Sequence, residues 1–253
     1  MPYTEHESCK MPEDLTQQVW RYMDFTKFVA MLENQALFFP NLTNLQGDPL
    51  EGFLTKPTVE QFRKVPDESE TIKAGISIEG CHVDPDPFNL RGHLALGIMR
   101  SLRNFLYVSS WHMSDHESAA MWKLYLKNGE GVAIQSTVGR LIESLKRVKG
   151  KVFVGMVEYV DYEKDRIPDP TNLSAAMHKR KIFEHEKELR TIFVDERNIE
   201  GLPLPVDIDV LIEKVFVAPT SPKWIYDLLI KVIARYGLNK EVVKPTLEQS
   251  PLY

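Results

Sequence analysis

The sequence predicts an α+β protein whose sheet is mixed or mostly antiparallel. Long segments with helical periodicity occur along the chain, and the apolar segments typical of strands are spaced irregularly between them. Neither Gly-x-Gly-x-x-Gly nor Gly-x-x-x-x-Gly-Lys follows a strand segment, which argues against a Rossmann dinucleotide site and a P-loop. The pattern of elements thus favours α+β without either of these nucleotide-binding loops.

One domain is expected to account for most of the chain. With 253 residues and a hydrophobic fraction of 43%, the protein can bury a full core. We expect a single α+β domain at residues 17–243, between a flexible N-terminal segment at 1–16 and a flexible C-terminal segment at 244–253.

The domain is expected to begin with a strand, a helix and a second strand. VWRYM predicts a strand at 19–23, Asp24 can cap a helix, and FTKFVAMLENQ predicts that helix at 25–35. ALFFP predicts the second strand at 36–40, and the glycines and prolines after it predict a loop that extends to Phe53.

The middle of the chain is less regular. Residues 57–80 are charged and weakly periodic, which predicts one short helix and a mobile excursion. A helix at 90–104 leads into a buried strand at 105–111, and Ser114 or Asp115 can cap the helix that follows.

Later segments continue to mix both kinds of element. Strands are expected at 132–135, 151–162, 188–194 and 213–218. Helices are expected at 138–148, 172–185 and 222–236.

Charge and cysteine content restrict the classes of function. A net charge of −5 argues against broad, nonspecific binding of nucleic acid, which depends on clustered Lys and Arg. Basic runs at 140–151 and 178–181 are expected to be solvated helix faces, although either could contact a phosphate-bearing ligand. Two cysteines, no signal-peptide pattern and no run of roughly 18 apolar residues lead us to expect a cytoplasmic protein with no membrane partner.

Polar side chains on two strands are candidates for a ligand site. Arg21 points to the face opposite Tyr22, and a guanidinium that reaches a cleft would suit a pair of phosphates, although a solvated arginine fits the same pattern. Ser109 and Ser110 close a strand just before Trp111, where their hydroxyls can bond a ligand or cap the next turn.

The segment FEHEKELRTIFVDE places carboxylates where a helix gives way to a strand. Glu184, Glu186 and Glu188 recur with period two, so on an extended segment they share one face, which Arg190 joins. Two neighbouring carboxylates can divide the work of polarising an acceptor and stabilising positive charge. A charged helix end would give the same pattern.

Other conspicuous residues fit structural roles. His112 and His116 are four residues apart, but no third ligand has suitable spacing, so no metal site is expected. Met121 and Trp122 share an apolar helix stripe with Tyr125 and are expected to pack in the core.

The order of these segments resembles the bacterial family catalogued as domain of unknown function 2971. The shared blocks, spread over roughly residues 18–195, are WRY, LFF, a loop with DPLEG, SSWH, ESAAMW with a later tyrosine and GVAI, and FEHEKELRTIF. The block from Met-Trp to Gly-Val and the Glu-x-Glu end are its most specific parts.

The same residues resemble ADP-ribosyltransferases of the Arg, Ser, Glu type. Those enzymes place an arginine on the first strand, a serine on a later strand and a Glu-x-Glu at the entrance of another, and Arg21, Ser109 and Glu188 occur in that order. The resemblance implies a split mixed or antiparallel sheet flanked by helices, and NAD as the substrate.

The resemblance also implies a role for each residue that binds NAD. Arg21 would hold the phosphates, and Ser109, with Ser110 beside it, would anchor the nicotinamide ribose. Tyr22 or Trp111 could stack on the nicotinamide.

Two carboxylates would carry the chemistry that the resemblance implies. Glu188 would bond the ribose 2′-hydroxyl and stabilise an oxocarbenium-like transition state, and Glu186 would position the acceptor. The product would be a macromolecule, protein or nucleic acid, that carries ADP-ribose. A bacterial toxin or phage-defence effector, with an antitoxin or immunity protein as partner, fits this activity.

Two alternatives stay open, the first because the usual Ser-Thr-Ser is Ser109, Ser110 and Trp111 here. One is a noncatalytic module that binds a nucleotide or a partner protein in the same cleft. The other is a metal-dependent nuclease that uses His112, His116 and nearby carboxylates.

Overall fold

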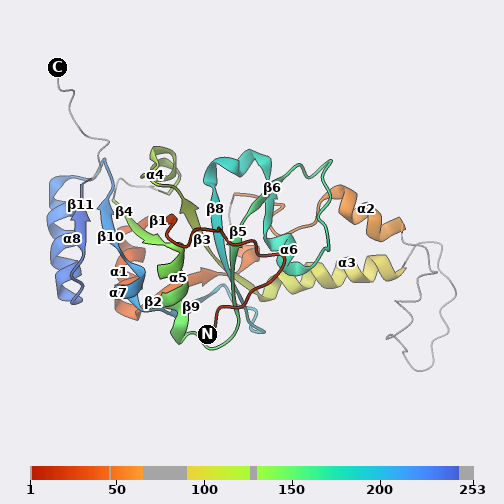
Figure 1. The fold of residues 1–253 in the computed structure, drawn as a ribbon, viewed down its shortest axis with the longest axis horizontal. Coiled ribbons are helices and arrows are strands. Elements are labelled where there is room, and N and C mark those ends of the chain that lie inside the picture. Colours follow the sequence, from red (N-terminus) through yellow and green to blue (C-terminus); the bar gives the residue numbers. More distant parts are fainter. Residues whose placement is uncertain (1, 46, 65–89, 126–129, 245–253) are drawn as a thin grey trace, which may run out of the picture.

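A central sheet organises the protein (Figure 1), whose computed structural model describes residues 2–45, 47–64, 90–125 and 130–244. The strands of this sheet, within the described residues, are β1 (Gln18–Asp24), β3 (Leu106–Met113), β4 (Gly131–Thr137), β5 (Val152–Met156), β8 (Glu188–Val194), β10 (Lys214–Val217) and β11 (Glu241–Val243). Their spatial order is β11-β10-β4-β1-β3-β8-β5, and every neighbouring pair is antiparallel except β10 with β11. The predicted α+β fold with a mixed, mostly antiparallel sheet is confirmed.

Two small sheets and several helices complete the described part of the chain. The small sheets pair β2 (Ala36–Pro40) with β9 (Gly201–Pro205) and β6 (Glu158–Val160) with β7 (His178–Arg180). The α-helices are α1 (Phe25–Asn34), α2 (Lys56–Lys64), α3 (Leu90–Leu102), α4 (Ala119–Tyr125), α5 (Val138–Ser144), α6 (Asn172–Ala176), α7 (Ile208–Leu211) and α8 (Lys223–Arg235). Short 3₁₀ helices are η1 (Leu42–Asn44), η3 (Arg103–Phe105), η4 (Leu145–Arg147) and η5 (Lys181–Glu186).

Helices cover both faces of the central sheet. Helices α1, α5, α7 and α8 pack on one face, where Phe28 and Leu141 are buried with Ile134 of β4 in the largest apolar cluster. On the other face, Trp122 of α4 packs with Tyr22 of β1, and α6 contributes to a separate cluster. Burial of these apolar surfaces is the main stabilising contribution to the fold.

The central sheet is split between β1 and β3. Along the whole of these two described strands, only Val19 with Met113 and Trp20 with His112 form pairs. Strand β1 nevertheless stays paired with β4 as far as Asp24, and β3 stays paired with β8 over most of its length. The two halves of the sheet therefore diverge after Trp20, which confirms the predicted split.

The α1–β2 unit begins where the sheet splits. The side chain of Asp24 accepts a hydrogen bond from the Lys27 main-chain N–H (2.8 Å) and caps α1, as predicted. At the other end, Gln35 adopts a left-handed conformation (φ 47°) that turns the chain into β2. Strand β2 then pairs with β9, and Asn41 just after it bridges to Tyr107 of β3. The unit therefore borders the split.

Two expected elements differ from the prediction because short strands interrupt them. The expected strand at 151–162 consists of β5 in the central sheet and β6 in a small sheet. The expected helix at 172–185 is wrong beyond Ala176, since β7 pairs in parallel with β6 before η5 begins. Strand pairing overrides the helical pattern of this segment.

The helix after β3 begins later than expected. Ser118 precedes α4, and its hydroxyl accepts a hydrogen bond from the Met121 N–H (3.4 Å), so neither Ser114 nor Asp115 is the cap. Part of the segment expected at 57–80 forms α2, and the remainder lies outside the described residues.

The N-terminal segment packs against the edge of the sheet. Val152 of β5 donates to the Pro2 carbonyl (2.8 Å), and Met156 donates to the Lys10 carbonyl (2.8 Å). The N-terminal residues thus pair with main-chain groups of the edge strand β5.

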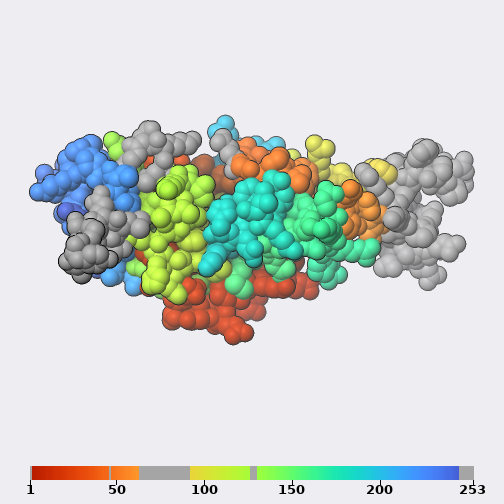
Figure 2. Space-filling view, turned by 90° about the horizontal axis from the view of Figure 1, so that it is seen from above, coloured from red at the N-terminus to blue at the C-terminus, as the bar shows by residue number. Residues whose placement is uncertain are grey.

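The molecule is elongated (Figures 1 and 2), with α8 near one end and α2 and α3 toward the other. Most of the C-terminal segment expected at 244–253 lies outside the described residues. Among the described helices, none has the length and apolar content needed to cross a membrane.

Candidate functional site

A cavity of about 510 Å³ lies at the split in the sheet. Its walls come from α1 and β2 on one side and from β3, η5 and β8 on the other. Six of the seven residues that the sequence singled out line it: Arg21, Tyr22, Ser110, Trp111, Glu186 and Glu188. Side chains from opposite faces of the sheet reach one space because β1 and β3 have diverged there.

Two cations, Arg21 and Lys27, are among the described residues that line this cavity, and Lys27 is paired with Asp24. One terminal nitrogen of Arg21 donates to the Ser109 hydroxyl, the other donates to the Phe38 carbonyl (3.2 Å), and the guanidinium carbon lies 5.7 Å from the centre of the Trp111 ring. In the part of the chain that the structure describes, no ion pair joins Arg21 to a carboxylate. Burial lowers the pKa of Arg21 to about 10, so the side chain remains a cation at neutral pH.

Ser109 lies behind Arg21 and does not line the cavity. Its side chain is buried, and its hydroxyl also accepts a hydrogen bond from Nε1 of Trp111 (3.1 Å). Ser109 thus fixes both Arg21 and Trp111, while the neighbouring Ser110 faces the cavity.

Tyr22 is held rigidly in the cavity wall. Its hydroxyl accepts a hydrogen bond from the Ser118 N–H (2.8 Å), and its ring meets the Trp122 ring edge to face at 4.9 Å. Burial raises the pKa of Tyr22 to about 12, so the hydroxyl stays protonated. Tyr125, expected in the core with Met121, is instead 45% exposed and lines the cavity.

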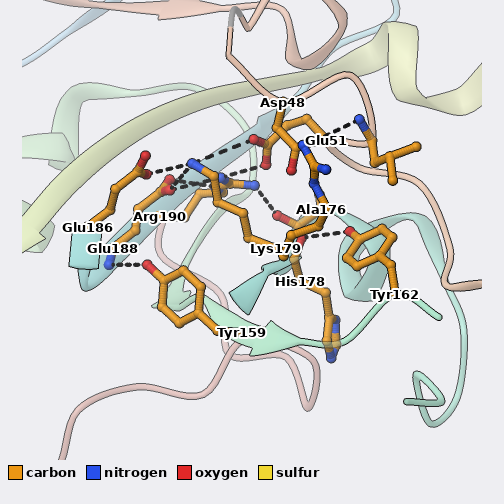
Figure 3. A network of polar contacts seen from close by, with 12 residues as sticks. Asp48, Glu51, Tyr159, Tyr162, Ala176, His178, Lys179, Glu186, Glu188 and Arg190 are labelled. Carbon is orange, nitrogen blue, oxygen red and sulfur yellow. Dashed lines mark hydrogen bonds and ion pairs between the residues drawn. The ribbon is translucent and has the colours of Figure 1, made fainter. Parts of the chain in front are cut away.

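The opposite wall carries a buried network of charges (Figure 3). Arg190 binds both oxygens of Glu188, from Nε at 2.7 Å and from Nη2 at 3.0 Å, and Lys179 lies 3.4 Å from the same carboxylate. Burial acts to raise the pKa of Glu188, but the charges of Arg190 and Lys179 outweigh it and lower the pKa to about 2. A hydrogen bond from the Ser110 side chain acts in the same direction. Glu188 is therefore ionised throughout the neutral range.

Glu186 joins Glu188 through a turn and not through an extended strand. Glu186 ends η5, and Lys187 is left-handed (φ 39°), so the two carboxylates meet at the Lys179 ammonium, 2.5 Å from Glu186. The carbonyl of Glu186 accepts a hydrogen bond from Nδ1 of His112 (2.6 Å), which couples β3 to this turn. The period-two face expected for Glu184, Glu186 and Glu188 is wrong, although Glu186 and Glu188 do converge.

Sequence reasoning missed two members of the network. Lys179 belongs to the basic run expected on a solvated helix face, yet it is buried on β7 between acidic partners. Glu51 reaches the network from the loop after η1, with Arg190 at 2.8 Å and Lys179 at 3.7 Å (Figure 3). Nearby, Asp48 pairs with Arg180 at 2.7 Å. The DPLEG block was the available signal for this loop.

The two walls of the cavity have opposite charge. On the acidic wall, the three carboxylates of Glu51, Glu186 and Glu188 face the two cations of Lys179 and Arg190, which leaves one formal negative charge. The other wall presents the positive Arg21, together with Asp24 and Lys27, whose opposite charges pair with each other. A ligand with separated negative and positive groups would match this arrangement.

The two histidines do not meet. Burial lowers the pKa of His112, whose Nδ1 is bound to the Glu186 carbonyl, and His116 is exposed beyond the end of β3. Across the described residues, no group of three His, Cys, Asp or Glu side chains is placed to hold a metal ion.

No family model and no curated protein matches the sequence. Among solved structures, the chain is similar to Thermus sp. 2.9 DarT in complex with NAD+, with 9% identity and a TM-score of 0.39 over 93% of this chain and 97% of that chain. The same protein in complex with ADP-ribosylated ssDNA gives 9% identity and a TM-score of 0.39 over 93% and 96%. Its complex with carba-NAD+ gives 10% identity and a TM-score of 0.37 over 92% and 96%. These are distant likenesses.

Proposed function

We propose that the protein is an ADP-ribosyltransferase that uses NAD as its substrate and modifies a macromolecular acceptor. The observation that carries the proposal is that Arg21, a cation with uncharged partners, shares one cavity with the carboxylates of Glu186 and Glu188. The cavity volume of about 510 Å³ lies within the roughly 300–1,000 Å³ typical of small-molecule sites. The order of motifs that resembles the Arg, Ser, Glu type supports the same conclusion.

NAD carries a negative and a positive group that match the oppositely charged walls of the cavity. Its pyrophosphate is negative, and its nicotinamide is a positively charged pyridinium joined to the phosphates through a ribose. The pyrophosphate would lie at Arg21, whose guanidinium suits paired phosphate oxygens. The nicotinamide ribose would then lie toward Glu188, and the rings of Tyr22 and Trp111 are the aromatic surfaces available to the nicotinamide.

The roles that we propose for Ser109 and Ser110 differ from those that the motif resemblance implies. Ser109 would act through Arg21 as a positioning residue, because its hydroxyl is buried and already bound to the guanidinium. Ser110 lines the cavity and bonds Glu188, so it would face the nicotinamide ribose.

Transfer of ADP-ribose requires little proton chemistry at the sugar. The bond between ribose C1′ and the nicotinamide nitrogen breaks, its electron pair stays on the nitrogen, and nicotinamide leaves neutral while positive charge develops on the ribose. Glu188, ionised and held in place by Arg190, would stabilise that charge. Glu186 would orient the acceptor nucleophile, which bonds C1′ and loses its proton.

The experiment is incubation of the full chain with NAD labelled in its adenylate phosphate. Protein extract, single-stranded DNA and RNA are supplied separately as acceptors, and both nicotinamide release and label transfer are measured. We expect release of nicotinamide with label on one class of acceptor. Absence of nicotinamide release with every acceptor would overturn the proposal.

A substitution at the second carboxylate separates the two roles. In Glu186→Gln we expect label transfer to fall more than nicotinamide release, because water can still take the ribose at C1′. Glu143→Gln on the exposed part of α5 is the matched control and should leave both unchanged. Equal loss of both signals in Glu186→Gln would contradict a role in positioning the acceptor.

We also infer a biological setting from the motif resemblance to ADP-ribosyltransferases of the Arg, Ser, Glu type. A cytoplasmic bacterial toxin or phage-defence effector, neutralised by an antitoxin or immunity partner, would arrest growth when expressed alone. Growth arrest in a bacterial host that disappears in Glu188→Gln supports this role. Normal growth with an active protein would contradict it.

A second candidate is a module that binds NAD without consuming it. The observation in its favour is that Arg190 already occupies both oxygens of Glu188. Calorimetry that shows NAD binding by a protein that releases no nicotinamide would decide for this module.

A further inference from the structure

A second hollow continues from the cavity past β2. It has a volume of about 550 Å³, is more open than the cavity, and shares Phe38, Pro40 and Leu45 with it. The polar residues Thr43 and Asn44 of η1, together with Glu200, complete its lining. The two spaces therefore adjoin at these three residues, and Phe38 lines both.

Phe38 stands at the junction with much of its ring in solvent. The side chain is 53% exposed, whereas its neighbours Leu37 and Phe39 on β2 are buried. A Cβ at Gly201 would overlap the far end of the Phe38 ring, so the ring lies directly against the glycine backbone. One side of the aromatic ring is thus supported while much of the remainder stays free for a ligand.

Arg21 connects this ring to the phosphate site. The guanidinium donates to the main-chain carbonyl of Phe38 (3.2 Å), so the cation lies next to the residue that carries the exposed ring. In a nucleotide, a single sugar separates the phosphate from the base. A phosphate at Arg21 thus brings its base within reach of Phe38, on the side away from Glu186 and Glu188.

We propose that Phe38 and the hollow beyond it bind the adenine base of the dinucleotide. The inference rests on the proposed function, and it assigns a direction to NAD: nicotinamide toward Glu188, pyrophosphate at Arg21, and adenine on Phe38. Stacking on an exposed aromatic ring is the usual way in which proteins hold a base without a dedicated pocket. The open, partly polar hollow suits a base whose edge stays hydrated.

Calorimetry with ADP and with inorganic pyrophosphate separates the base from the phosphates. Phe38→Ala should weaken ADP binding about 5- to 100-fold and leave pyrophosphate binding unchanged, because only ADP carries a base to stack. Phe38→Trp should restore ADP binding. Trp224→Ala removes an equally exposed aromatic side chain from α8 and should change neither affinity.

Three results of the binding measurements would each overturn the adenine subsite. They are no binding of ADP to the wild-type protein, equal affinities for ADP in wild type and Phe38→Ala, and a parallel loss of ADP and pyrophosphate binding in Phe38→Ala. A base on the acceptor is the competing occupant. If Phe38→Ala raised KM for a single-stranded DNA acceptor but not for NAD, the base would belong to the acceptor and the subsite would be wrong.

Failure of the proposed function gives a different result. ADP binding that depends on Phe38, in a protein that releases no nicotinamide from NAD, would leave the subsite standing and remove the transferase. If the wild type released nicotinamide and Phe38→Ala left KM for NAD unchanged, the transferase would stand and the adenine subsite would be wrong.

Discussion

At Arg21 the chain keeps a half-buried cation beside a serine hydroxyl and a main-chain carbonyl, with no carboxylate paired to it among the described residues. Desolvation of a guanidinium is costly, and proteins usually offset it with an acidic partner. On the other wall, Arg190 has such acidic partners, since Glu188 and Glu51 both form ion pairs with it. The contrast between the two arginines supports our proposal that Arg21 binds an anionic ligand.

The first prediction concerns Arg21→Met. We expect ADP affinity to fall about 10- to 100-fold, which corresponds to the loss of hydrogen bonds to a charged group. Thermal unfolding should occur at the same or a higher temperature, because the substitution removes a desolvated charge that has no ion pair.

Calorimetry and thermal melting check this prediction, with Arg197→Met as the matched control. Arg197 is exposed and paired with Asp195, so its loss should alter neither measurement appreciably. A large fall in melting temperature for Arg21→Met with unchanged ADP affinity would show that Arg21 is structural.

At the scale of elements, the α1–β2 unit gives the site its shape. Asp24 is both the last residue of β1 and the N-cap of α1. The strand that carries Arg21 therefore passes directly into the helix that borders the cavity. The turn at Lys187 shapes the other wall, because it brings the carboxylates of Glu186 and Glu188 to the Lys179 ammonium.

The second prediction concerns the cap of α1. Asp24→Ala should lower the free energy of unfolding by about 1 kcal/mol, because the Lys27 N–H loses its side-chain acceptor. Asp24→Asn keeps an acceptor and should lose much less. Chemical denaturation measures both, and equal stabilities for the Ala and Asn variants would contradict a capping role.

Elements with long, regular patterns could be predicted from the sequence, including β1, α1, β3, β8 and α8. The elements that the sequence did not predict are short strands whose pairing partners are distant in the chain. Strand β7 has three residues within a basic run and depends on pairing with β6, and β9 contains prolines and depends on β2. Local periodicity carries no information about such pairings.

The candidate site divides in the same way. Arg21 and Ser110 could be named because they lie on strands that the sequence predicts, β1 and β3, and Glu186 and Glu188 because they flank the start of the predicted strand β8. Glu51 and Lys179 could not, because only the folded loop and sheet bring these distant segments together. Side chains from opposite faces of the sheet line the same cavity, which the sequence did not predict. Strand alternation alone does not show where β1 and β3 separate.

At the scale of the whole molecule, buried charge links the site to stability. The acidic wall holds ionised and buried Glu188 on β8, between β3 and the edge strand β5. Removing the charge from such a group leaves its cationic partners uncompensated. Acid should therefore destabilise the protein through the same network that would serve the chemistry.

The third prediction is the pH dependence of unfolding. The pKa of Glu188 is lowered to about 2 in the folded state, against about 4.3 in an unfolded chain. The unfolded state then binds more protons between these values, so the contribution of Glu188 is complete above about pH 5 and is lost as the pH falls toward 2.

Urea denaturation at pH 7, 5 and 3 checks the sign. We expect the contribution of Glu188 to the free energy of unfolding to fall by roughly 1–2 kcal/mol between pH 5 and pH 3, so the total fall should be smaller in Glu188→Gln. Identical pH dependence in wild type and Glu188→Gln would mean that this carboxyl does not contribute.

The measurement that tests the central claim most directly is the rate of nicotinamide release from NAD by wild type and Glu188→Gln, with circular dichroism to verify that the variant is folded. Loss of a group that stabilises transition-state charge should lower kcat about 100- to 1,000-fold, with a much smaller change in KM. Glu143→Gln should match the wild type. Equal kcat in a folded Glu188→Gln protein, or no release by the wild type, would contradict the account.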